Sequence, residues 1–471
     1  MLYHSFEFAA LFAVVLGAFA VSPQKYRPPL LLAASYLFYS DFEPAHLLVL
    51  LVVTGTTYAG AIEIGKGRGG AVLVGSVGVA LGALAYFKYS ALLWRATGAA
   101  EAPPWSPTLP IGISFYTFQA VSYLVDVRRG RIEPDRDLLR VALYLAFFPQ
   151  VLAGPIERAG RLLPQLRSMA RPPGAEVVVG AKVVLWGLFC KLVVADKLGL
   201  LVDPIYAVPG DHPGLAALVA IYLYAFQIFF DFYGYTTVSI GLARMLGVRL
   251  SINFDNPYAA RSIRDFWRRW HITLTSWFRD YVYVPLGGRA PSRWVWFRNV
   301  MAVFLLSGLW HGAALNFLVW GGLHGLYYVV GALTATWRAR VWTAFGGARV
   351  PGLRGAVGLV WTFHLVTAAW IVFRVGSASD SWTLVRGALG VSAPGWLGLG
   401  DLLGRPSAAV YLACFGCALL AQASGFAWRT VSAPSEGWRA VGVEMAFLNT
   451  LVVGLVLLGD IGSRAFIYFR F

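Results

Sequence analysis

Two of the seven histidines in this chain, His271 and His311, have sequence surroundings suited to chemistry. His311 lies in SGLWHG between two apolar segments, where Gly308 and Gly312 would let a backbone or a ligand approach closely and Trp310 can wall a cavity. Ionisable groups inside membrane segments are functional candidates, and an imidazole with an ordinary pKa of about 6.5 can act as a general base. A structural histidine is the alternative.

His271 belongs to a polar, cationic stretch, Asn253 to Gly288, in an otherwise apolar chain. Asp265 to Phe278 contains no Gly or Pro, which predicts one continuous helix with Arg264, Arg268 and His271 along one face. The arginines make a membrane-spanning helix costly, so we expect a cytoplasmic interfacial or re-entrant position. On these residues alone, the simplest explanation is an interfacial helix whose arginines meet lipid phosphate.

The other histidines are weaker candidates. Backbone hydrogen bonding is expected to account for His4, His46 and His212, whereas His324 and His364 lie inside apolar segments and could have a functional role. No two histidines have the i, i+4 spacing of a helical metal site, and no Gly-rich phosphate loop or nucleophilic-serine elbow occurs. We expect neither a metal nor a nucleotide site.

The composition is that of a polytopic membrane protein, with 58% hydrophobic and 13% charged residues in 471. The net charge of +16 is spread over short loops between apolar runs, so the positive-inside rule explains it better than nucleic-acid binding. The three cysteines lie within apolar segments and indicate neither disulfides nor a metal site. The run Phe6 to Val21 lacks a basic region and a cleavage site, which predicts a retained helix.

The apolar segments predict helices in series, and the basic loops set their orientation. The expected segments are 6–21, 29–40, 45–62, 71–87, 109–126, 138–152, 177–201, 214–243, 299–310, 313–335, 356–373, 407–427 and 440–459. Segment 138–152 is short with basic flanks and is expected to be a re-entrant hairpin. Segments 299–310 and 313–335 should form a hairpin with His311 near its turn or within its depth. Both termini are expected outside.

Four blocks of the sequence together resemble the membrane-bound O-acyltransferase (MBOAT) family. They are LPIGISFYTFQAVSYLVDV (109–127), FFPQVLAGPIER (147–158), NFDNPYAARSIRDFWRRWHITLTSWFRDYVYVPLGG (253–288) and LLSGLWHGAALNFLVWGGLHG (305–325). Within the family, the match is to the bacterial branch that acylates extracytoplasmic polymers, such as alginate O-acetylation proteins and their peptidoglycan and D-alanyl relatives. The resemblance covers residues 100–470, in what we expect to be a single domain over 1–471.

The resemblance implies an all-α bundle of about 11 to 12 transmembrane helices plus re-entrant helices, with a cytoplasmic and an external funnel. His311 corresponds to the family's histidine usually treated as catalytic, and His271 to the one near the cytoplasmic entrance. The family's preceding polar residue corresponds to either Asn253 or Asp255. The expected substrate-contacting residues are Asn253, Asp255, Arg264, Arg268 and Trp310.

The chain ends in SRAFIYFRF, which resembles a Phe-x-Tyr-x-x-Phe ending found in this branch. In that ending the Tyr is proposed to carry the acyl group, and Tyr468 would be that residue here, with Arg470 where Gln is frequent. An aromatic interfacial anchor is the alternative.

The implied enzyme is an O-acyltransferase of the cell (inner) membrane. We expect it to move an acetyl group from a cytoplasmic thioester, either acetyl-CoA or an acyl carrier protein, toward a polysaccharide hydroxyl outside, with an SGNH-type partner and no tightly bound cofactor. D-alanyl transfer is one alternative. A transporter or flippase that uses intramembrane His and Arg is another, although no inverted repeat is apparent. An assembly scaffold is the third, and the intact His271 and His311 argue against it.

Overall fold

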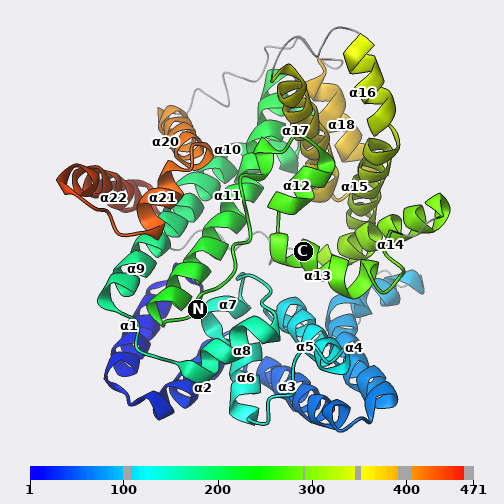
Figure 1. Cartoon of the computed structure of the whole chain (residues 1–471). Helices are drawn as coiled ribbons and strands as arrows, with labels where there is room; N and C mark the ends of the chain where they lie inside the picture. The colour runs from blue at the N-terminus through cyan, green and yellow to red at the C-terminus, as the bar shows by residue number, and fades with distance from the viewer. Residues whose placement is uncertain (99–107, 290–291, 345–351, 391–405, 461–471) are drawn as a thin grey trace. The chain divides into compact units, whose positions relative to one another are not determined.

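A computed structural model describes residues 1–98, 108–289, 292–344, 352–390 and 406–460, and its regular elements there are all helical (Figure 1). Two compact units are present. Unit 1 contains Met1–Phe189, Gly234–Ile252 and the described chain from Trp428 on, and unit 2 contains Cys190–Tyr233 and Asn253–Ala427. Single helices pass from one unit into the other, and the expectation of one domain stays a prediction.

Unit 1 holds the first half of the helices. They are α1 (Phe6–Val21), η1 (Gln24–Tyr26), α2 (Arg27–Ser40), α3 (Pro44–Gly65), α4 (Gly69–Ala96), α5 (Ile113–Arg128), α6 (Leu138–Ala146), α7 (Phe148–Val151), α8 (Ala159–Ser168), α9 (Gly174–Leu188) and α22 (Trp438–Leu458), with the end of α11 (Leu215–Met245) and most of α21 (Phe426–Ser432). Helices α3, α4 and α5 pack on one another, and α6 packs on α2, α3 and α8.

Unit 2 contains the polar stretch and both candidate histidines. Its elements are η2 (Phe189–Ala195), α10 (Asp196–Ala207), η3 (Pro209–Asp211), the first part of α11, η4 (Pro257–Ala259), α12 (Ile263–Arg269), α13 (Ile272–Phe278), η5 (Arg279–Tyr283), α14 (Arg293–His311), α15 (Leu315–Leu333), α16 (Ala335–Ala344), α17 (Leu353–Arg374), α18 (Ala378–Ala388) and α20 (Pro406–Ala423). Helix α15 packs on α12, α14 and α17.

Hydropathy and helix length agree with a multi-pass membrane protein. Six described helices are long and apolar enough to cross a membrane, or eight if the bent pairs α15 with α16 and α20 with α21 each count as one span. Helix α1 and the run Leu138–Val151 are apolar but shorter. The fold is therefore all-α and polytopic, as predicted, while the expected total of about 11 to 12 spans stays a prediction.

The segment expected to be a re-entrant hairpin is two short helices, α6 and α7, followed by irregular backbone at residues 152–158. This backbone is buried, and side chains satisfy part of it: Gln150 Nε2 donates to the Pro155 carbonyl (2.7 Å) and Thr236 Oγ1 to the Ala153 carbonyl (3.0 Å). Irregular backbone at membrane depth is tolerated only where the protein supplies such partners. The membrane position of this segment stays a prediction.

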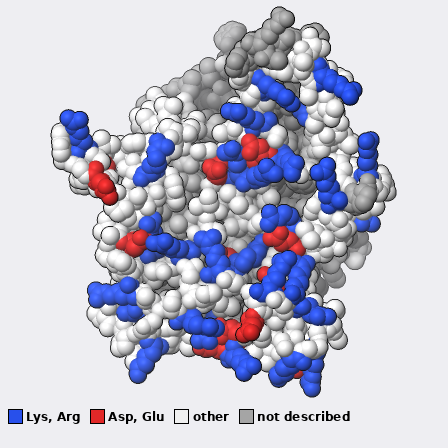
Figure 2. All heavy atoms as spheres, viewed as in Figure 1, with Lys and Arg blue, Asp and Glu red and all other residues white. Residues whose placement is uncertain are grey.

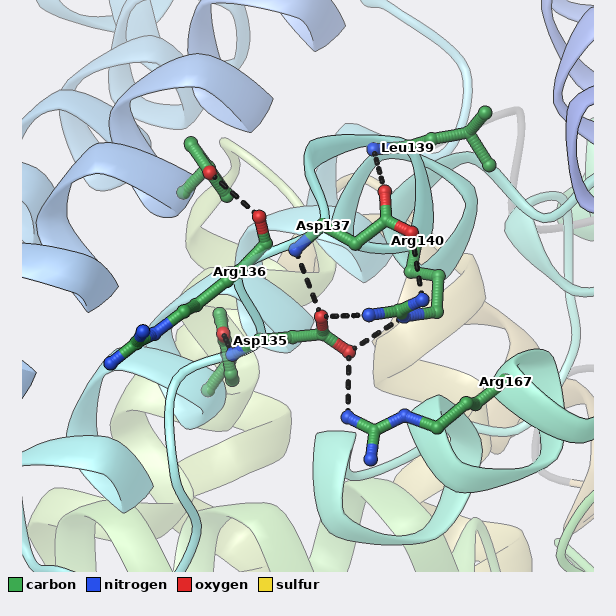
Figure 3. A network of polar contacts seen from close by, with 8 residues as sticks. Asp135, Arg136, Asp137, Leu139, Arg140 and Arg167 are labelled. Atoms are coloured by element: carbon green, nitrogen blue, oxygen red, sulfur yellow. Dashed lines mark hydrogen bonds and ion pairs between the residues drawn. The ribbon is translucent and has the colours of Figure 1, made fainter.

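A buried carboxylate, Asp135, ties together α5, α6 and α8 of unit 1 (Figure 3). It accepts hydrogen bonds from the Asp137 N–H (3.0 Å) and from Nε and Nη2 of Arg140 (2.9 and 2.7 Å), and it pairs with Arg167 at 3.5 Å. The Asp135 N–H donates to the Tyr123 hydroxyl (2.8 Å). Burial favours a raised pKa, but the Arg140 and Asp137 hydrogen bonds outweigh it and hold the pKa of Asp135 below its ordinary value.

In unit 2, α14 and α15 form the predicted hairpin, and glycines set how closely they approach (Figure 1). A Cβ added at Gly308 would collide with the Phe317 backbone, and one added at Gly321 would collide with the Phe304 backbone. Small residues of this kind let helix backbones approach within a membrane bundle. The close pairing fixes the end of α14, where His311 is the last residue.

Candidate active site

The predicted continuous helix over 265–278 is wrong, because the chain breaks at His271. Helix α12 ends at Arg269 and α13 begins at Ile272. His271 has left-handed backbone angles (φ 43°, ψ 54°), which are uncommon for a residue other than glycine. The expected single face of Arg264, Arg268 and His271 therefore does not exist, and the His271 ring turns inward, with the residue only 1% exposed.

Hydrogen bonds to the non-helical segment Asn253–Asp255 stabilise this break. The Ile272 N–H donates to the Asn253 carbonyl, and the Asp255 N–H donates to the Arg269 carbonyl, both at 2.9 Å. One residue on each side of the break, Arg269 and Ile272, is thus paired with the segment Asn253–Asp255 instead of with a helical turn. Left-handed conformations at non-glycine residues cost on the order of 1–3 kcal/mol and cluster at functional sites.

The Asn253 side chain fixes the orientation and the tautomer of the His271 imidazole. Asn253 Oδ1 lies 3.1 Å from His271 Nδ1, 3.2 Å from the Thr273 backbone nitrogen and 2.9 Å from Thr273 Oγ1. A backbone N–H can only donate, so the atom of Asn253 that faces it must be the oxygen. His271 Nδ1 must then carry the proton, which leaves the lone pair on Nε2.

Two polar atoms of this pair have no hydrogen-bond partner among the residues that the structure describes: His271 Nε2 and Asn253 Nδ2. One is an acceptor and the other is a donor. Burial lowers the pKa of His271 to about 3, so the imidazole is neutral at physiological pH. The pair can therefore accept one proton or hydrogen bond and donate another to a bound molecule.

His311 ends α14 in an aromatic setting. It is 5% exposed, and its ring lies near those of Trp310 (centroids 4.8 Å apart), Trp320 (4.9 Å) and Phe373 (5.3 Å). Trp320 comes from α15 and Phe373 from α17. The Gly312 backbone directly after it would not accept a side chain, because an added Cβ would collide with the Phe317 ring. Three helices of unit 2 thus fix the position of this imidazole.

Trp310 joins the two histidines. Its ring centroid lies 6.1 Å from that of His271 and 4.8 Å from that of His311. Both imidazoles, 40 positions apart in the numbering, therefore flank one indole inside unit 2. The expectation that Trp310 contacts the substrate stays a prediction.

The remaining predicted site residues lie elsewhere. The Asp255 side chain is 60% exposed and pairs with Arg269 at 3.7 Å, so of the two alternatives only Asn253 contacts a histidine. Arg264 and Arg268 are exposed on α12, and Figure 2 shows blue atoms gathered where that helix lies. Tyr468 lies outside the described residues.

Several partners of the histidines were not predicted, among them Thr273, Trp320, Phe373 and Phe232, whose ring centroid lies 4.7 Å from that of His271. Thr273 carried a usable signal, since a hydroxyl two residues after a histidine can share its hydrogen-bond acceptor. The aromatic residues carried none, because the chain is rich in them throughout. In the described part of the chain, no group of three His, Cys, Asp or Glu residues could hold a metal ion.

Comparison with known proteins identifies the family to which this site belongs. The family model for MBOAT, the membrane-bound O-acyltransferase family, matches residues 114–368, which include both histidines. The chain is 36% identical over 397 residues to the "Probable alginate O-acetylase AlgI" of Pseudomonas aeruginosa, covering 82% of this chain and 74% of the relative. It is 30% identical over 420 residues to the "Peptidoglycan O-acetyltransferase" of Helicobacter pylori, covering 80% and 76%.

A more distant relative is the "Teichoic acid D-alanyltransferase" of Bacillus subtilis, 27% identical over 288 residues that cover 58% of this chain and 70% of the relative. All three relatives carry names of acyl-transferring enzymes. Together with the family match, the shared length makes the chain an enzyme of acyl transfer in a multi-pass membrane fold. The protein belongs to the membrane-bound O-acyltransferase family.

Proposed function

We propose that this acyltransferase moves an acetyl group from a cytoplasmic thioester to a hydroxyl of an extracytoplasmic polysaccharide. The observation that carries the proposal is the pair of buried imidazoles on either side of Trp310, one of them held by Asn253 in a defined tautomer. Acyl transfer to a hydroxyl needs a base for its proton and a donor for the developing oxyanion. Within unit 2 both kinds of group are present.

In the proposed reaction, His311 takes the proton of the acceptor hydroxyl while its oxygen attacks the thioester carbonyl. The tetrahedral oxyanion accepts a hydrogen bond from Asn253 Nδ2, an amide N–H that has no partner among the described residues. Collapse of the intermediate forms the ester and expels the thiolate, which takes the proton from His311. Neutral His271 orients the donor through its Nε2 lone pair. No proton is gained or lost overall.

An acetyl group is proposed rather than D-alanine because the more similar relatives, at 36% and 30% identity, are named O-acetylating enzymes, whereas the D-alanyltransferase is 27% identical. The donor is proposed to be acetyl-CoA or an acyl carrier protein. The acceptor is an alginate-like or cell-wall polysaccharide, reached with an SGNH-type partner. The inner membrane is the proposed location, with both termini outside.

The test is acetyl transfer by the purified protein in detergent or liposomes. The protein is supplied with radiolabelled acetyl-CoA, acetylated carrier protein or D-alanyl carrier protein, and transfer to added polysaccharide is measured. His311→Ala should lower the rate by roughly 10²–10⁴-fold, the usual effect of losing a general base. His364→Ala is the matched control, since His364 lies exposed on α17. Wild-type rates in His311→Ala would contradict the proposal, and transfer of D-alanine alone would replace acetyl with D-alanyl.

The proposed orientation has its own test. Cysteines substituted at Arg264 and Arg268, both exposed on α12, should resist an impermeant maleimide added outside intact cells and react after the cells are opened. Labelling from outside would show that the proposed orientation is wrong.

The proposed role of the tail is tested separately. The variant Tyr468→Phe keeps the aromatic anchor and removes only the oxygen. Full acetylation by that variant would leave Tyr468 no role as an acyl carrier.

A further inference from the structure

A third histidine, His324, is enclosed by aromatic rings in unit 2, and the proposed reaction gives it no role. It is 0% exposed. Its nearest rings are Trp320 (centroids 4.9 Å apart) and Trp267 (5.0 Å), and Phe266 stacks on it at 6.2 Å with 9° between the planes. Trp370 lies at 6.4 Å. Residues of α12, α15 and α17 thus form an aromatic box around one imidazole.

Several polar atoms of this box have no hydrogen-bond partner in the described parts of the chain. They are both ring nitrogens of His324 and the indole nitrogens of Trp267 and Trp320. A neutral imidazole has one donor and one acceptor, and each indole has one donor. Buried polar groups without partners are rare in native proteins, since leaving one unpaired costs folding free energy, and a bound water usually satisfies them.

The box adjoins the candidate active site through one shared wall. Trp320 lies edge-on to His311, with centroids 4.9 Å apart and planes at 88°, and it lies 4.9 Å from His324 at 68°. The same indole therefore contacts both imidazoles. Whatever fixes the Trp320 ring from the His324 side also fixes one wall of the His311 site.

We propose that the box binds water between His324 and the indole N–H groups of Trp267 and Trp320, and that His324 is a positioning residue that holds Trp320 against His311. Three donors and one acceptor enclose this site, and because one water accepts two hydrogen bonds and donates two, a pair of waters can satisfy the set. The second half of the proposal rests on the proposed acyl transfer at His311, whereas the first half does not.

The key variant is His324→Phe, which keeps a ring of similar shape and removes both nitrogens. The melting temperature in detergent should fall, because the variant leaves the Trp267 and Trp320 N–H groups without the bound water. The kcat for acetyl transfer should fall on the order of 10- to 100-fold, since small displacements of a reacting group have effects of that size. The KM for acetyl-CoA should stay within about twofold, and the pH dependence of kcat should shift, because the surroundings of His311 change.

Two further variants complete the design. His324→Gln keeps a donor and an acceptor and should restore much of the kcat, and exposed His364→Phe is the matched control without effect. A raised melting temperature in His324→Phe would show that the imidazole is buried without bound water, and it would refute the proposed water site. If His324→Phe does not fold, Trp267→Phe decides, because it removes one N–H of the box on the His324 side, where Trp267 contacts His324 and Trp320, and it should still lower kcat by about tenfold.

The results also separate this inference from the proposed function. If wild-type protein transfers acetyl groups and His311→Ala does not, a kcat within twofold of wild type in His324→Phe overturns the positioning role alone. If His311→Ala retains activity, the proposed function fails and the positioning role fails with it. The melting temperatures still decide whether water is bound, because that measurement does not depend on activity.

Discussion

Asn253→Ala is the sharpest perturbation of the candidate site, because one oxygen atom serves three buried donors. Removing Asn253 Oδ1 leaves His271 Nδ1, the Thr273 N–H and the Thr273 hydroxyl without their acceptor. Each buried group left unpaired costs about 1–3 kcal/mol. Taking the lower value for each, since relaxation and entering water offset part of the loss, we expect a destabilisation of about 3 kcal/mol.

The same substitution should act on the chemistry. Without Oδ1 nothing holds the proton on Nδ1 of His271, and the Nδ2 donor proposed to face the oxyanion is also lost. Loss of one oxyanion donor typically lowers kcat by about 10²–10³-fold. Acetyl transfer by purified protein and the melting temperature in the same detergent measure both effects.

Asp255→Ala is the matched control, two positions along the same extended segment. The Asp255 carboxylate is 60% exposed and pairs only loosely, at 3.7 Å, with Arg269. We expect its stability to change by less than about 0.5 kcal/mol, as for most surface substitutions. If Asn253→Ala matches Asp255→Ala in both stability and rate, then Oδ1 does not organise the His271 turn, and the assignment of the tautomer is wrong.

Three other predictions follow from separate parts of the structure. Gly321→Ala should destabilise the protein by about 1–3 kcal/mol through collision with the Phe304 backbone, whereas Gly331→Ala on the same helix meets open space and should be neutral; thermal unfolding of the two variants compares them. Asp135→Asn removes the charge that pairs with two arginines, so the free energy of unfolding should fall by about 1.5–3 kcal/mol, the value of a charged hydrogen bond. A lowered melting temperature measures this loss. Because burial lowers the pKa of His271 to about 3, its imidazole binds a proton between pH 6.5 and pH 5 only in the unfolded chain, and this residue should lower stability by about 2 kcal/mol from pH 7 to pH 5. Melting curves at the two pH values should therefore show that His271→Gln loses about 2 kcal/mol less stability over this interval than the wild type.

The helices formed by the long apolar segments could be predicted, because the sequence signal for such a helix lies within the segment itself. Helix α1 begins and ends at the predicted residues, Phe6 and Val21, and the segment predicted at 356–373 is α17, Leu353–Arg374. The place of His311 at the end of a hairpin was also predictable, since apolar runs flank it and a glycine follows it directly. In lipid, a long apolar run has few alternatives to a helix, because every backbone group must find its partner within the segment.

The break at His271 could not be predicted in this way. The residues from 265 to 278 include no helix breaker, and their local preference favours one helix. The chain instead breaks because Asn253, 18 positions earlier, supplies acceptors for the N–H groups of Ile272 and Thr273. Local periodicity carries no information about a hydrogen bond to a distant residue.

The choice between Asn253 and Asp255 as the partner of a histidine also could not be made from the local sequence. Both are polar, both precede His271 at a similar distance, and the sequence left them as alternatives. A regular extended segment would place residues 253 and 255 on the same side, but the backbone bends at Asp255, and the structure buries Asn253 while it leaves Asp255 exposed. Asn253 lies at the buried turn at His271, where an amide can accept from three donors without the cost of burying a charge, and Asp255 lies at the surface, where a carboxylate keeps its hydration.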